Sequence, residues 1–161
     1  MLDLIVRVLG ILLEWITGRR GQHREILQKE METIENWVSL VLEYDQERLS
    51  FIRGLITRRI DIFDISSYPQ GQALPQLEKL RPKVKAITER YPELKVLVDR
   101  FDVDSETDTI SDFIGIYLLS AAGIEEGPPL EELYSQASKA VSERAEIAAD
   151  IHGEILRLTH R

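Results

Sequence analysis

Residues 22–66 decide the fold, and they read QHREILQKEMETIENWVSLVLEYDQERLSFIRGLITRRIDIFDIS. Apolar residues recur in this stretch at alternating spacings of three and four, with one slip near Asp45, which is the period of an amphipathic α-helix. The apolar positions are Leu27, Met31, Ile34, Val38, Val41, Leu49, Ile52, Ile56 and Phe63. Because a helix with one apolar face cannot bury that face alone, the stretch predicts a long helix packed against other helices.

Two further stretches keep the same period. One runs from Leu77 to Phe101 and contains Pro82 and Pro92. Each proline removes a backbone donor, so we expect a kink there or two shorter helices lying end to end. The other stretch runs from Leu130 to Leu158. Pro129, with Glu131 and Glu132 in the first turn after it, marks its start.

Turn signals separate these stretches. Tyr68-Pro69-Gln70-Gly71 is a turn, so the long helix should end near Ser66 and the next should begin near Ala73. A shorter apolar repeat runs from Ile110 to Ala121. No stretch alternates as a strand does, and the sequence therefore predicts an all-α protein. We expect a single-domain antiparallel helical bundle of four to five helices, with long second and last helices.

Composition excludes several classes of function. The chain of 161 residues has 28 acidic and 20 basic residues, a net charge of -8 and no cysteine. Without cysteine there is no disulfide, zinc-thiolate site, iron-sulfur cluster or thiol nucleophile. The acidic balance argues against nucleic acid as a partner, because nonspecific binding to phosphates depends on excess lysine and arginine.

The first residues form an unusual segment. Between Leu2 and Ile16 the polar or small residues Asp3, Arg7, Gly10 and Glu14 form one narrow stripe, and every other position is apolar. An ordinary surface helix has an apolar arc of roughly 100 degrees, so this helix has more apolar surface than one bundle face can cover. We divide the chain accordingly into a hydrophobic N-terminal helix, residues 1–18, and a helical bundle, residues 22–161.

Three environments could bury the apolar surface of this helix. They are the bundle core on several sides, a membrane surface, or a partner protein, including a second copy. As a helix the apolar part is about 20 Å long, shorter than a membrane span requires. A signal peptide is poorly supported, because the basic cluster follows the apolar region. The expected docking surface consists of Leu4, Ile5, Val8, Leu12, Trp15 and Ile16. The candidate contacts to lipid headgroups are Arg19, Arg20 and Arg24.

No catalytic or cofactor site is predicted. The histidines, at positions 23, 152 and 160, lack the spacing that places two metal ligands on one helix face. The acidic residues from Asp102 to Asp108 have Thr107 and Phe113 where a calcium loop needs glycine and glutamate, so we interpret them as a solvated loop. No glycine-rich phosphate loop or serine nucleophile motif occurs.

Three charged residues fall within the apolar faces of the predicted helices: Asp45, Arg59 and Arg144. Each would cost several kcal/mol if it were buried without a partner. We therefore expect them to pair across helices or to lie at the rim of the bundle, with Asp45 and Arg144 as one pair. Their expected role is to set the register of the helices.

Two short motifs resemble those of the LemA family. Arg58-Arg59-Ile60-Asp61-Ile62 is similar to that family's Arg-Arg-x-Asp-Leu element, and Tyr91-Pro92-Glu93-Leu94-Lys95 is similar to its Tyr-Pro-x-Leu-Lys element. The asparagine that follows the first element in the family is Ile65 here. The resemblance implies a membrane-tethered antiparallel helical bundle without a defined enzymatic activity.

Together these patterns predict a non-enzymatic interaction or scaffold protein without a cofactor. Its apolar N-terminal helix would dock on a membrane surface or on a partner subunit, which includes a homo-oligomer. We expect the protein in the cytoplasm, either free or peripheral to a membrane. The alternative is a small-ligand-binding or enzymatic bundle with a pocket lined by Tyr91, Tyr117 and Tyr134.

Overall fold

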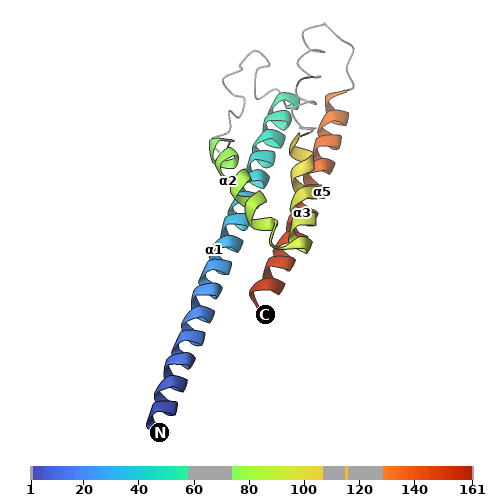
Figure 1. Cartoon of the computed structure of the whole chain (residues 1–161). Coiled ribbons are helices and arrows are strands. Elements are labelled where there is room, and N and C mark those ends of the chain that lie inside the picture. The colour runs from blue at the N-terminus through green and yellow to red at the C-terminus, as the bar shows by residue number, and fades with distance from the viewer. Residues whose placement is uncertain (1, 58–73, 107–114, 116–128, 161) are drawn as a thin grey trace.

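A computed structural model describes residues 2–57, 74–106, 115 and 129–160. The elements in these ranges are α1 (Leu2–Ile56), α2 (Leu74–Thr88), α3 (Pro92–Glu106) and α5 (Leu130–Thr159). Successive helices run in opposite directions, so that α1 and α3 rise in Figure 1 while α2 and α5 descend. The predicted all-α antiparallel bundle is confirmed for the described residues, as is the long last helix.

A single helix, α1, covers both the expected N-terminal helix and most of the expected second helix. It has 55 residues and passes without a break through residues 18–22, where we expected two helices to meet. No proline lies between Leu2 and Ile56. The glycines in this stretch cost a helix only about 1 kcal/mol each. Gly18 and Gly21, which lie where the apolar stretch gives way to polar residues, therefore do not end the helix.

The two prolines of the stretch from Leu77 to Phe101 act differently. Pro82 lies inside α2, whereas Pro92 is the first residue of α3, where its missing N–H is not needed. The two helices do not lie end to end as expected. The chain reverses between them, so that Arg81 and Lys85 of α2 both form ion pairs of 3.1 Å with Asp102, near the end of α3.

The core is divided between two levels of the bundle. All four helices contribute to the larger cluster, where the rings of Trp37 and Phe101 meet edge to face at 5.3 Å between centroids. The smaller cluster joins the last turns of α1 to the first turns of α5. Its buried members are Leu49, Phe51, Ile52, Leu55, Ala137 and Val141. Among the α1 residues whose side chains are described, the buried apolar ones therefore run from Met31 to Leu55.

Several expectations concern residues outside the described ranges. These are the end of a helix near Ser66, the turn at residues 68–71, and the short helix from Ile110 to Ala121, of which only Gly115 is described. The neighbouring boundaries are described: α2 begins at Leu74, next to the expected Ala73, and α5 begins directly after Pro129.

Candidate functional site

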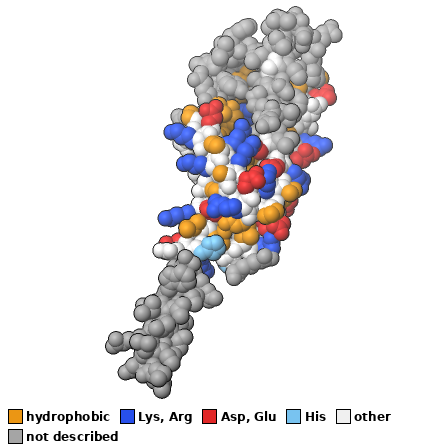
Figure 2. All heavy atoms as spheres, in the orientation of Figure 1, with side chains coloured by type: hydrophobic (Ala, Val, Ile, Leu, Met, Phe, Trp, Pro, Cys, Tyr) orange, Lys and Arg blue, Asp and Glu red, His pale blue; other side chains and the backbone are white. Residues whose placement is uncertain are grey.

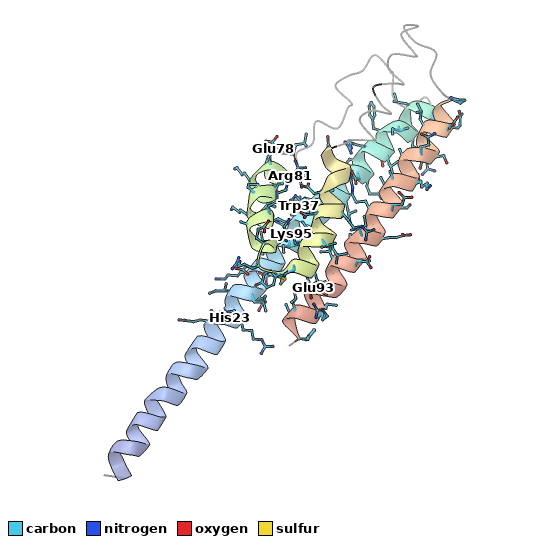
Figure 3. The ribbon with its side chains drawn as sticks, turned by 45° about the vertical axis from the view of Figure 1, so that its right-hand side comes forward. His23, Trp37, Glu78, Arg81, Glu93 and Lys95 are labelled. Carbon is cyan, nitrogen blue, oxygen red and sulfur yellow. The ribbon has the colours of Figure 1, made fainter. Side chains whose placement is uncertain are left out.

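The N-terminal part of α1 projects from the bundle. Residues 21–26 are exposed, and Leu27 is the first α1 residue with a described side chain that packs against the core. In Figures 1 and 3 the helix continues from there past the C-terminal end of α5, and no other described helix lies beside it. We call residues 2–20 of α1 the projecting segment.

The projecting segment contains every residue of the expected docking surface, from Leu4 to Ile16, together with Arg19 and Arg20. Of the three environments considered, burial in the core of this chain does not fit the described structure, because no described helix lies alongside the segment. Nor does any described helix have the length and apolar character needed to cross a membrane. A membrane surface and a partner protein remain.

A groove lies where α1 leaves the bundle. The last turns of α5 and the facing turns of α1 enclose about 300 Å³ there. Its walls include Arg24, Leu27 and Met31 from α1 and Leu156 and His160 from α5. Leu156 is 43% exposed and Ile26, which precedes Leu27, is 53% exposed. Apolar side chains are therefore exposed at the end of the bundle from which the projecting segment extends.

The face of the bundle seen in Figure 2 has no patch of a single charge sign. Basic, acidic and hydrophobic side chains are mixed on it. Arg90, in the turn between α2 and α3, forms an ion pair of 2.7 Å with Glu30 of α1. His152 of α5 forms a hydrogen bond of 2.8 Å with Glu35 of α1. Such mixing on this face is typical of a solvated surface and differs from the basic stripe that binds nucleic acid.

A buried ionic cluster joins α1 to α5. Arg144 donates a hydrogen bond of 2.6 Å to one carboxylate oxygen of Asp45, and Arg48 donates one of 3.1 Å to the other. Asp45 is only 1% exposed. Burial raises the pKa of its carboxyl group above the usual value, and the two guanidinium groups oppose that shift by favouring the charged form.

The expected pairing of Asp45 with Arg144 is thus present, while Arg59 lies outside the described residues. Arg48, which was not predicted, is 2% exposed and belongs to the same cluster. Its position could have indicated this, because Arg48 follows Asp45 by three residues and precedes Ile52 by four, which places all three on one helix face.

Aromatic rings complete the surroundings of the two arginines. The guanidinium carbon of Arg48 lies 4.5 Å from the centroid of the Tyr44 ring, and that of Arg144 lies 5.9 Å from the centroid of the Phe101 ring. Contacts of this kind contribute about 0.5–2 kcal/mol each. The cluster therefore connects α1, α3 and α5 at one level of the bundle.

The described tyrosines do not line a common pocket. Tyr91 donates a hydrogen bond of 2.8 Å to Glu30, and burial and this bond raise the pKa of its hydroxyl group. Tyr134 packs instead against the smaller core cluster. Tyr117 lies outside the described residues. The expected pocket between these three side chains is therefore not supported by the two that are described.

Asp102 corrects the expectation of a solvated acidic loop. It lies in α3, is 5% exposed and binds Arg81 and Lys85 of α2. It is buried because it lies four residues after Val98, on the face of α3 that is turned toward the core. In the part of the chain that is described, no three histidine, aspartate or glutamate side chains gather as metal ligands would.

Comparison with family models, with curated proteins and with solved structures finds no match for this chain. The projecting segment and the buried cluster are therefore interpreted from their own chemistry.

Proposed function

We propose that this is a non-enzymatic interaction protein whose projecting segment docks the helical bundle on a membrane surface or on a partner subunit. One observation carries the proposal: α1 continues beyond the bundle as a helix with no described neighbour, along the stretch where only Asp3, Arg7, Gly10 and Glu14 interrupt an apolar sequence. Soluble monomers rarely expose apolar patches of more than a few hundred Å². A surface of this kind is typical of a binding site.

The charges beside the segment favour a membrane surface. Arg19 and Arg20 follow the apolar stretch directly, and Arg24 is exposed where the bundle begins. A helix that lies in the membrane interface through its apolar arc places such residues among anionic headgroups, which contribute roughly 1 kcal/mol for each arginine. The resemblance to the LemA family also implies a bundle held at a membrane.

Flotation of the intact protein with lipid vesicles tests the proposal, alongside a chain that lacks residues 1–20. We expect the intact protein to float with vesicles that contain phosphatidylserine and the shortened chain to remain unbound. If neither chain floats, light scattering tests for a second copy as the partner. An intact dimer or larger assembly that becomes monomeric on shortening supports a partner subunit, whereas an intact chain that is monomeric and unbound contradicts docking on a membrane or on a second copy.

Replacing both Arg19 and Arg20 with glutamine tests the role of the basic residues. Because each arginine near an anionic surface contributes about 1 kcal/mol, the double substitution should lower partitioning onto phosphatidylserine vesicles by about 30-fold. Partitioning onto uncharged phosphatidylcholine should change little. Arg100→Gln, on the exposed face of α3, is the matched control. An equal loss on both kinds of vesicle would contradict a headgroup contact.

A further inference from the structure

A cavity of about 200 Å³ lies between α1, α2 and α5, well away from the projecting segment. One part of its wall is apolar and consists of Trp37, Val41, Leu74 and Leu77. The charged residues of the wall are Asp45, Arg48, Glu78, Arg81 and Arg144. Figure 3 shows that Glu78 and Arg81 come from α2 and Trp37 from α1, so the cavity depends on how these helices pack.

The volume limits the ligand to a small molecule. Drug-sized ligands occupy pockets of roughly 300–1,000 Å³, which is more than this cavity offers. In another protein an apolar cavity of about 150 Å³ holds one benzene ring. The present cavity therefore has room for one ring, or a branched aliphatic group of similar size, together with one small polar group.

Arg144 is the residue of the cavity wall that can bind an anionic group of a ligand. Its side chain is 7% exposed, and one of its terminal nitrogens binds Asp45. Its Nε is buried and has no hydrogen-bond acceptor among the described residues. Arg144 also lines the cavity, so a carboxylate that enters meets a buried guanidinium group whose hydrogen-bonding capacity Asp45 does not exhaust. Carboxylates match the planar guanidinium group best among small organic anions.

The acidic residues of the cavity wall limit the charge that a bound anion can carry. Asp45 and Glu78 line the same cavity and repel a ligand that carries two negative charges. The apolar wall also disfavours a fully hydrated ion such as inorganic phosphate. We infer that the cavity binds a small monocarboxylate with an aromatic or branched aliphatic body, its carboxylate on Arg144 and its body against Trp37 and Leu77.

Fluorescence of Trp37 measures binding directly. The chain has only two tryptophans, so Trp15→Phe leaves Trp37 as the single emitter. We expect phenylacetate and 4-methylpentanoate to change its emission saturably with a Kd below about 1 mM. Phenylacetamide, which has the same shape without the charge, should bind at least about tenfold more weakly, which corresponds to about 1.4 kcal/mol. Inorganic phosphate should not bind.

The inference is overturned if no carboxylate gives a saturable change, if the amide binds as tightly as the acid, or if phosphate competes with phenylacetate. Two variants locate the site. Leu77→Phe reduces the cavity while keeping every charge, and it should weaken phenylacetate by about tenfold or more. Arg144→Met should abolish the preference for acid over amide, whereas Arg100→Met should leave it unchanged.

Leu77→Phe remains informative if Arg144→Met does not fold, since the buried ionic cluster is intact in it. Unchanged phenylacetate binding by a folded Leu77→Phe protein would place the ligand elsewhere and contradict the inference.

Discussion

Replacing Asp45 with alanine is expected to lower the free energy of unfolding by about 3–5 kcal/mol. The carboxylate lies between two guanidinium groups at 2.6 and 3.1 Å, and all three residues are buried. Without Asp45, Arg144 stays buried and loses the one carboxylate that binds it among the described residues. Urea unfolding followed by circular dichroism measures the change.

A matched control separates this effect from the loss of any acidic residue of α1. Glu47→Ala removes a carboxylate from an exposed position two residues along the helix, and it should cost less than about 0.5 kcal/mol. Replacing the whole cluster with apolar residues, by Asp45→Leu, Arg48→Met and Arg144→Met together, should recover most of the stability, because apolar groups need no ionic partners. A loss below about 1 kcal/mol for Asp45→Ala would contradict the assigned role of the cluster.

Leu12→Glu should reduce docking of the intact protein by about 30- to 150-fold, which corresponds to 2–3 kcal/mol. The substitution removes an apolar side chain from the middle of the expected docking surface and introduces a charge that must leave water when the segment binds. The stability of the bundle should not change, since the projecting segment has no described neighbour. Vesicle flotation and urea unfolding measure the two quantities on the same protein.

Gly10→Glu is the matched control for Leu12→Glu. It adds the same charge to the same segment, but on the narrow stripe that already holds Asp3, Arg7 and Glu14. Docking should therefore change by less than about threefold, or 0.7 kcal/mol. Equal losses for the two substitutions would mean that net charge, and not the apolar arc, controls docking.

The sequence predicted the helices with a regular apolar period well. The long α5 and the start of α2 follow from apolar spacing and from Pro129, which are local signals. The continuity of α1 was not predicted, because glycine both permits a turn and is tolerated inside a helix, and neighbouring residues do not decide between the two.

The reversal between α2 and α3 and the cavity depend on contacts between residues that are distant in sequence. Pro92 is compatible with a kink and with a new helix, and the ion pairs of Asp102 with Arg81 and Lys85 show which one forms. The pairing of Asp45 with Arg144 could be predicted because both fall on apolar faces. The cavity could not, because three helices enclose it.

The central claim is that the projecting segment is a docking surface outside the core of the bundle. The most direct test compares the urea unfolding of the intact chain with that of a chain that lacks residues 1–20, both in a detergent that keeps the intact chain monomeric. If the claim is correct, the two unfolding free energies agree within about 0.5 kcal/mol. A shortened chain that is less stable by several kcal/mol would show that the segment belongs to the core, and would contradict the claim.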